Sequence, residues 1–176
     1  MKNLKSILLA SILTVGAFST TLFTACNPDA CKDVVCQNGG TCIDGECTCP
    51  AGYTGTNCDV KANSLFAGTW SAKEKVNGST TWATPYAVTV ITDGSDSKVF
   101  YLQQYGNYAC TPATYQVAAT TSDGKSYSIS SNACSTSFTG SGSMTVNGSS
   151  STINGTYTAT YGSPSTTDNV VIEMTK

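Results

Sequence analysis

Nine cysteines are the residues of this chain that are best equipped to do chemistry, because thiols can pair, bind metal or carry a lipid. Six of them crowd into residues 31–58. Cys110 and Cys134 stand alone in the C-terminal part, and Cys26 lies by itself near the N-terminus. Eight of the nine therefore suit four disulfides, and Cys26 needs a separate explanation.

Acid–base catalysis would have to come from carboxylates, because the chain has no histidine. Residues 65–176 contain six carboxylates, and those at positions 93, 96, 123 and 168 fall in predicted turns, which Asp commonly forms. Glu74 and Glu173 lie in predicted strands, and a retaining glycosidase would need such a pair about 5 Å apart. We expect them instead on the outer surface, beside Lys73 or Lys75. The sequence thus predicts no enzyme, no cofactor and no metal.

Charged residues are scarce, at 11% of the chain, with a net charge of −2 and no arginine. Nucleic acid is therefore not an expected partner, because its phosphates call for a basic patch. Ser, Thr, Gly and Asn take the usual places of Lys and Glu, which favours exposed β-sheet over helix.

Residues 1–25 have the features of an export signal, with two lysines followed by an apolar run that ends near Phe23. A single membrane-spanning anchor is the alternative interpretation. Thr24-Ala25-Cys26 resembles the processing site of bacterial lipoproteins, where the cysteine is acylated and becomes the new N-terminus. The resemblance implies that residues 26–30 are a lipid-anchored tether, since several acyl chains anchor stably. It places the protein at the bacterial outer membrane, on the cell surface or the periplasmic face.

Residues 31–58 read Cys-x4-Cys-Gln-Asn-Gly-Gly-Thr-Cys-x4-Cys-Thr-Cys-Pro-Ala-Gly-Tyr-Thr-Gly-Thr-Asn-Cys. A segment this short needs cross-links, because it cannot bury enough apolar surface to fold alone. The spacing by itself allows 15 connectivities. The pattern resembles an epidermal-growth-factor-like (EGF-like) module. The resemblance implies the disulfides Cys31–Cys42, Cys36–Cys47 and Cys49–Cys58.

Metal binding is the alternative use of such a module. Zinc is disfavoured in an exported chain without histidine. Calcium-binding modules of this family carry an acidic or amide cluster ahead of the first cysteine, whereas Asn27-Pro28-Asp29-Ala30 is interrupted by proline and contains no Glu. We expect a rigid spacer or docking module, joined by a linker over residues 59–64 to the domain that follows.

Residues 65–176 read as β-strands separated by turns. Val170, Ile172 and Met174 alternate with other residues, and Asp93-Gly94, Asp123-Gly124 and Asn147-Gly148 mark hairpins. The expected strands cover residues 67–76, 86–92, 98–105, 113–120, 125–131, 136–147, 151–161 and 168–175. Eight sequential strands predict an all-β protein with an up-and-down antiparallel β-barrel. A two-sheet β-sandwich is the alternative.

Gly68-Thr69-Trp70 at the start of the first strand resembles the opening of lipocalins and related calycin barrels. With the leader, the chain is similar to lipocalin-like lipoproteins of Bacteroidetes-type bacteria. The resemblance implies that Trp70 closes one end of the barrel. In an up-and-down meander Cys110 and Cys134 fall in loops at the same end, so we expect a fourth disulfide, Cys110–Cys134. A redox-active pair does not fit this spacing.

Two non-enzymatic binding functions follow. In the first, the barrel captures a small hydrophobic ligand in a cavity of at least about 300 Å³. The residues predicted to line it are Tyr157, Tyr161, Met144, Val88, Val90 and Ile172. In the second, the core is filled and the surface adheres to an extracellular protein or glycan, for which exposed Tyr and Trp such as Trp82 are suited. Tyr105 and Tyr108 flank Gly106-Asn107 in a predicted turn, so we expect both to be exposed and to contact such a partner.

Overall fold

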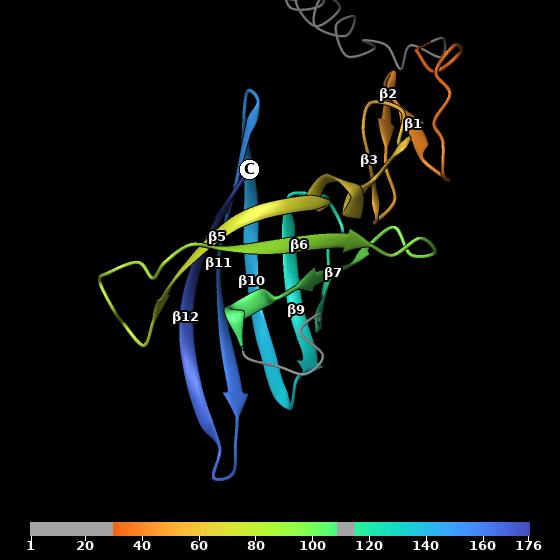
Figure 1. Ribbon diagram of the computed structural model, residues 1–176. Coiled ribbons are helices and arrows are strands. Elements are labelled where there is room, and N and C mark those ends of the chain that lie inside the picture. Colours follow the sequence, from red (N-terminus) through yellow and green to blue (C-terminus); the bar gives the residue numbers. More distant parts are fainter. Residues whose placement is uncertain (1–29, 109–114) are drawn as a thin grey trace, which may run out of the picture.

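The computed structural model describes residues 30–108 and 115–176, which are nearly all β-structure (Figure 1). The cysteine-rich module, residues 31–58, contains a hairpin of β1 (Thr41–Ile43) and β2 (Glu46–Thr48). Its last strand, β3 (Tyr53–Thr54), pairs with β4 (Val60–Lys61) just beyond the module. The expected linker is therefore partly a strand.

Three disulfides hold the module together, and they join Cys31 to Cys42, Cys36 to Cys47 and Cys49 to Cys58. This is the pairing that the EGF-like resemblance implies. Cys134 is also disulfide-bonded. Its expected partner Cys110 lies outside the described residues, as does Cys26.

The C-terminal domain is a closed antiparallel barrel of eight strands, in which each strand pairs with the next and the last pairs with the first. The strands are β5 (Gly68–Val76), β6 (Tyr86–Thr92), β7 (Val99–Gln103), β8 (Gln116–Thr120), β9 (Ser126–Ala133), β10 (Thr136–Asn147), β11 (Ser150–Tyr161) and β12 (Thr166–Thr175). Pairing of β12 with β5 closes the barrel. The predicted up-and-down barrel is confirmed, and the β-sandwich alternative is wrong.

The strand predicted over residues 98–105 ends earlier than expected. β7 stops at Gln103, because Gln104 has a left-handed backbone with φ of 60°. The chain then makes the short 3₁₀ turn η2 (Tyr105–Asn107), in which Gly106 has φ of 82°. A positive φ is easily adopted by glycine, and here it turns the chain inward over the end of the barrel.

The segment between the module and the barrel forms a fixed junction. The 3₁₀ helix η1 (Ala62–Phe66) follows β4 directly and buries Ala62, Asn63 and Phe66. The Asn63 side-chain amide donates to the carbonyl oxygens of Asp93, Asp96 and Val99, at 3.2, 2.8 and 2.8 Å. These bonds attach η1 to the loop between β6 and β7.

The module itself also contacts the barrel. The Gly52 N–H donates to the Ser122 carbonyl at 2.9 Å, and the Ala62 N–H donates to the Gly52 carbonyl at 2.8 Å. The Lys61 ammonium donates to the Gly94 carbonyl at 2.9 Å. The module is thus seated on the β6–β7 and β8–β9 loops, at the barrel end that carries η1 (Figure 1).

Candidate functional site

The barrel interior contains the residues that the sequence suggested as a ligand lining. Val88, Val90, Tyr157 and Ile172 are buried there, as period-2 alternation predicted. Met144 and Tyr161 are only half-buried. Met144 packs against the edge of the core. Tyr161 donates from its hydroxyl to Asp168 Oδ2 at 2.8 Å.

Side chains fill this interior. At the η1 end, Phe66 stacks on Phe100 with ring centroids 4.7 Å apart, and Tyr127 meets both rings edge-on. At the other end, Tyr105 lies 4.8 Å from Tyr157 between ring centroids. These contacts are those of a close-packed core.

A row of glycines lets one aromatic ring lie flat against the wall. Tyr127, Gly142 and Gly155 are neighbours across β9, β10 and β11. A Cβ at Gly142 would stand 2.5 Å from Tyr127 Cε1, and a Cβ at Gly155 would stand 2.6 Å from its hydroxyl oxygen. Only glycine fits beneath the Tyr127 ring at these positions, so the glycines are part of the solid core.

Trp70, which the Gly-x-Trp resemblance predicted to close one end of the barrel, lies next to η1. Its side chain is fully buried, and its indole N–H donates to the Phe66 carbonyl at 2.8 Å. The ammonium of Lys176 lies 4.5 Å from the Trp70 ring centroid and donates to the Ala67 carbonyl at 2.6 Å. The C-terminal residue thus covers the indole through a cation–π contact.

The prediction that Tyr105 is exposed is wrong, and Tyr108 is only partly exposed. Tyr105 is fully buried because the inward turn at Gln104 and Gly106 directs its ring into the barrel. Tyr108 is half-buried and meets Phe138 and Tyr161 edge-on, at 5.6 and 5.7 Å between centroids. Tyr105 cannot contact a surface partner in this conformation.

Glu74 is also placed differently from the expectation of an outer-surface ion pair. It follows Trp70 and Ala72 on the inner face of β5, where it is buried and accepts hydrogen bonds from the hydroxyls of Tyr86 and Tyr157. Burial raises the pKa of the Glu74 carboxyl, while these two bonds oppose the shift. The Glu173 prediction is confirmed, because its carboxylate meets the Lys73 ammonium on the outer face at 2.7 Å. The two carboxylates thus face opposite sides of the wall and form no glycosidase pair.

Two buried hydroxyls in the core have no hydrogen-bond partner. They belong to Tyr105 and Tyr127, and burial raises the pKa of both phenols. The two phenols also interact with each other, but their hydroxyls do not have the geometry of a hydrogen bond. An unsatisfied buried hydroxyl costs stability.

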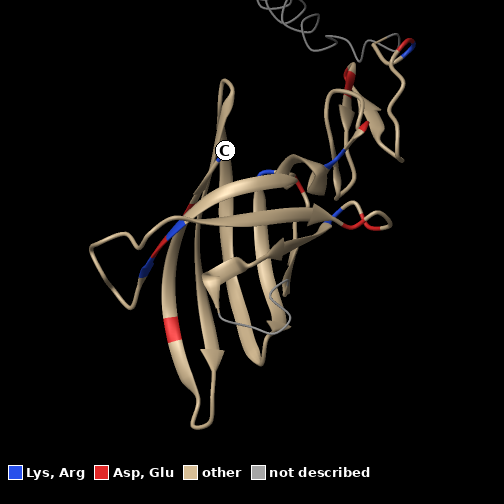
Figure 2. Ribbon diagram, in the orientation of Figure 1, with Lys and Arg blue, Asp and Glu red and all other residues tan. Residues whose placement is uncertain are grey.

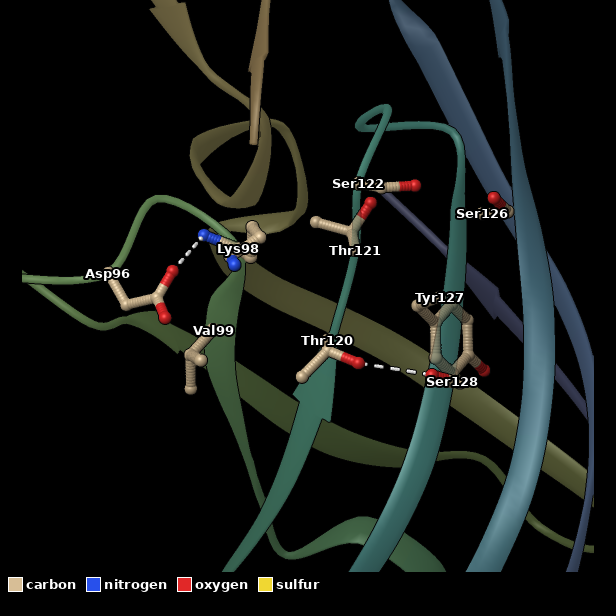
Figure 3. A pocket seen from close by; sticks show the side chains of 9 residues that line it. All are labelled: Asp96, Lys98, Val99, Thr120, Thr121, Ser122, Ser126, Tyr127 and Ser128. Atoms are coloured by element: carbon tan, nitrogen blue, oxygen red, sulfur yellow. Dashed lines mark hydrogen bonds between the residues drawn. The ribbon is translucent and has the colours of Figure 1, made fainter. Parts of the chain in front are cut away.

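Near the junction, a hollow of about 480 Å³ opens between the ends of β7, β8 and β9 (Figure 3). Thr120 and Ser128 share a hydrogen bond of 3.0 Å across it, and the Asp96 carboxylate accepts the Lys98 backbone N–H at 2.8 Å. The residues that line it are Asp96, Lys98, Val99, Thr120, Thr121, Ser122, Ser126, Tyr127 and Ser128. Its polar groups largely satisfy one another or the turn.

The outer wall of β9, β10 and β11 has a different character. These strands contain no charged residue, and Figure 2 shows them without blue or red. Their outward positions carry hydroxyl and amide side chains, namely Ser126, Ser128, Ser130, Asn132, Ser137, Thr139, Ser141, Ser143, Thr145, Thr152, Asn154, Thr156, Thr158 and Thr160. We call this surface the hydroxyl face. Its alternation is readable in the sequence, but the register that aligns the three strands is not.

Trp82 lies on the outer side of β5, and β12 separates β5 from the hydroxyl face. The loop that carries it folds back over the strand, since the Ala83 N–H donates to the Glu74 carbonyl at 2.8 Å. The ammonium groups of Lys73 and Lys75 lie 4.8 and 4.5 Å from the centroid of its indole ring. The sequence marked Trp82 as a stacking candidate but gave no sign of its two lysine neighbours.

Residues 30–108 and 115–176 contain no cluster of three or more His, Cys, Asp or Glu side chains that could hold a metal ion. Among the same residues, no helix has the length and apolar character needed to cross a membrane.

Comparison with known proteins identifies the module. Residues 31–61 match the family model of the Teneurin-like EGF domain. The chain is 51% identical over 37 residues to human netrin-G2, a match that covers 19% of this chain and 7% of netrin-G2. It is 38% identical over 48 residues to neural-cadherin of Drosophila melanogaster, covering 25% of this chain and 2% of the cadherin. The chain therefore spans a small fraction of the curated relatives it matches.

Among solved structures, a protein of unknown function from Bacteroides ovatus is similar, with a TM-score of 0.45 and 13% identity. The match covers 61% of this chain and 40% of that one. The family match and the disulfides agree on the N-terminal part. Residues 31–58 are an EGF-like module, and an eight-stranded antiparallel β-barrel follows it.

Proposed function

We propose that this protein is a lipid-anchored interaction protein of a bacterial cell envelope, which works through the outer wall of its barrel. The observation that carries the proposal is the contrast between the two sides of that wall. The inner side is filled by packed aromatic and aliphatic side chains. The outer side of β9, β10 and β11 offers uncharged hydroxyl and amide groups to a partner.

The anchor in this proposal is an acylated Cys26, which lies outside the described residues. The EGF-like module follows it and is seated on the barrel through Gly52, Lys61 and η1. A module held by several hydrogen bonds transmits orientation as well as distance. It therefore presents the barrel wall at a fixed angle to the chain that leads to the membrane.

The absence of catalysis is part of the proposal. Glu74 and Glu173, the strand carboxylates, lie on opposite faces of the wall. Asp93 and Asp123 are occupied as turn formers, each accepting several bonds from the residues that follow it. These side chains are thus committed to structure, which supports a binding role.

A lipocalin-like second function, capture of a small ligand inside the barrel, is favoured by one observation. The hydroxyls of Tyr105 and Tyr127 are buried without partners, and a ligand with polar atoms would satisfy them. Such a ligand has to displace the Tyr105 ring, which contacts Tyr157 and Phe138. For this reason we rank capture second.

The test uses the whole mature chain with Cys26→Ser, secreted through an oxidising compartment so that its disulfides form. One sample is exposed to a lipid extract of the source cells and examined by native mass spectrometry. A second is incubated with insoluble envelope polymer and pelleted. Co-sedimentation with a bare protein mass supports the surface function. A bound small molecule without co-sedimentation overturns it in favour of capture.

Lipid anchoring has its own test in the source cells. The wild-type protein is expected to incorporate a labelled fatty acid and to fractionate with the outer membrane, and the Cys26→Ser variant to do neither. Equal labelling of both proteins would refute acylation at Cys26.

A further inference from the structure

We propose that Trp82, Lys75 and the adjoining wall of β12, β11 and β10 form a binding site for a polysaccharide that carries carboxylate groups. The inference rests on the proposed function, because it needs a barrel that works through its outer wall. One sugar ring stacks on Trp82, its carboxylate pairs with Lys75, and the following sugars lie across the hydroxyl face.

The indole of Trp82 is arranged as a platform. Lys73 and Lys75 both project from the outer side of β5, so their ammonium groups approach the ring from the side of the wall. Trp82 itself is half-buried, which leaves part of the indole in contact with solvent. A flat aromatic surface of this kind is suited to the apolar face of a sugar ring.

The two lysines have unequal partners. The Lys73 ammonium is bound to the Glu173 carboxylate at 2.7 Å. Within residues 30–108 and 115–176, no carboxylate lies within 4.0 Å of the Lys75 ammonium. Its cross-strand neighbour is Val171, which is 46% exposed and carries no charge. Lys75 is therefore placed to receive an anionic group from outside the chain.

The strand register extends this site into the hydroxyl face. Lys75, Val171, Thr156 and Ser141 follow one another across four paired strands. Adjacent strands lie about 4.8 Å apart, and residues on one face of a strand repeat at about 6.8 Å. In this row the hydroxyl groups begin at Thr156 on β11, and the exposed Val171 of β12 lies between them and Lys75. Hydroxyls donate and accept, as those of a sugar do.

Two hollows run along the same wall. One of about 530 Å³ includes Ser141, Ser143 and Asn154 in its lining. The other, of about 310 Å³, includes Thr139, Asn169 and Gly78, which belongs to the same loop as Trp82. Both are lined by Thr156 and Val171. They therefore adjoin one another, as an extended polymer requires.

A polysaccharide fits this wall better than a protein partner does. Protein interfaces draw their binding energy from buried aromatic and Arg anchors, and Ser and Thr are under-represented among such residues. The hydroxyl face consists of Ser, Thr and Asn, and the Trp82 ring lies beyond it, on the far side of β12. The positive charge of Lys75 beside this ring favours polysaccharides that carry acidic groups.

The test measures binding of the whole oxidised chain with Cys26→Ser to three uronate-containing polysaccharides, called polyuronates below: polygalacturonate, alginate and hyaluronan. Methyl-esterified polygalacturonate is the matched neutral probe, because it keeps the sugar backbone and masks the carboxylates. The variants are Trp82→Ala and Lys75→Gln. Lys125→Gln is the matched control, since Lys125 is exposed on the β8–β9 loop, away from Trp82.

We expect at least one polyuronate to bind and the methyl ester to bind at least tenfold more weakly. Trp82→Ala and Lys75→Gln should each weaken binding by roughly tenfold, with Lys125→Gln unchanged. Lys75 is half-exposed, so its substitution tests the site without endangering the fold. Added salt should weaken binding by the wild type but have less effect on Lys75→Gln.

Three results would overturn the inference: equal binding of the ester, unchanged binding by both site variants, or no binding to any polyuronate at millimolar concentration. If co-sedimentation with envelope polymer persists in any of these cases, the proposed surface function stands and only the ligand assignment fails. Loss of co-sedimentation in the wild type would remove both.

Discussion

Replacement of Tyr105 distinguishes a solid barrel from a ligand-carrying one. The Tyr105 ring is fully buried, 4.8 Å from Tyr157 and 6.4 Å from Phe138 between centroids. Tyr105→Ala removes this ring and leaves a cavity in the core. Truncations of buried aromatic residues to alanine cost about 3–5 kcal/mol. We expect a loss of this size in the free energy of unfolding.

Tyr105→Phe separates the ring from its hydroxyl. The hydroxyl has no partner, so its removal relieves the cost of burying an unsatisfied polar group. The free energy of unfolding should therefore be unchanged or raised by about 1 kcal/mol. Loss of the ring is thus expected to lower the free energy of unfolding, whereas loss of the hydroxyl alone is not.

The assay is equilibrium unfolding in guanidinium chloride with the disulfides intact, followed by tryptophan fluorescence, to which the buried Trp70 contributes. A loss below about 1 kcal/mol for Tyr105→Ala would refute the reasoning, because it is far smaller than a packed aromatic ring requires. The barrel would then have room for a ligand. A clear destabilisation by Tyr105→Phe would show instead that the hydroxyl has a partner.

Three further predictions concern the pH response, the glycine row and the junction. Burial raises the pKa of Glu74 in the folded protein above its ordinary value of about 4.5. The folded state therefore binds the Glu74 proton more tightly than the unfolded state does, and this stabilisation is lost as pH rises from about 4.5 through the raised pKa. The stability of Glu74→Gln relative to wild type should therefore increase over that range in pH-dependent thermal melts, and a pH-independent difference would contradict the assignment. Gly155→Ala places a Cβ 2.6 Å from the Tyr127 hydroxyl oxygen and should cost about 1–3 kcal/mol in denaturant unfolding, whereas Gly94→Ala, with open space around it, should cost far less. In Gly52→Ala the added Cβ would contact the Ser97 hydroxyl and stand 2.8 Å from Lys98 Cγ, at a backbone φ of +95°. NMR relaxation should therefore show the module tumbling more independently of the barrel. Unchanged relaxation would mean that Gly52 does not hold the junction.

The strands and the three module disulfides were largely predictable from the sequence. Alternation of apolar residues with period two is strong in β11 and β12, and the hairpin turns at Asp93, Asp123 and Asn147 separate the strands. The cysteine spacings carry a recognisable family pattern. These signals are local or nearly so, and each one depends on only a few neighbouring residues.

The positions of Tyr105 and Glu74 could not be predicted from local sequence patterns. Residues around Gly106-Asn107 have the composition of an exposed turn, but the positive φ at Gln104 directs Tyr105 inward. Glu74 shares the alternation of Trp70 and Ala72, yet its charge argued for the surface. Two tyrosines from β6 and β11 make the inner position tolerable, and only the closed barrel brings them together.

The seat of the module narrows the surfaces that remain for a partner. The β6–β7 and β8–β9 loops at one end of the barrel are engaged by Gly52, Lys61 and η1. At the other end, η2 turns inward and Tyr105 fills the space behind it. A partner that meets neither end has to approach the wall from the side. Because β9, β10 and β11 carry no charge and Trp82 and Lys75 lie on the other side of β12, binding to this wall should depend on Trp82 and Lys75 more than on the β6–β7 and β8–β9 loops.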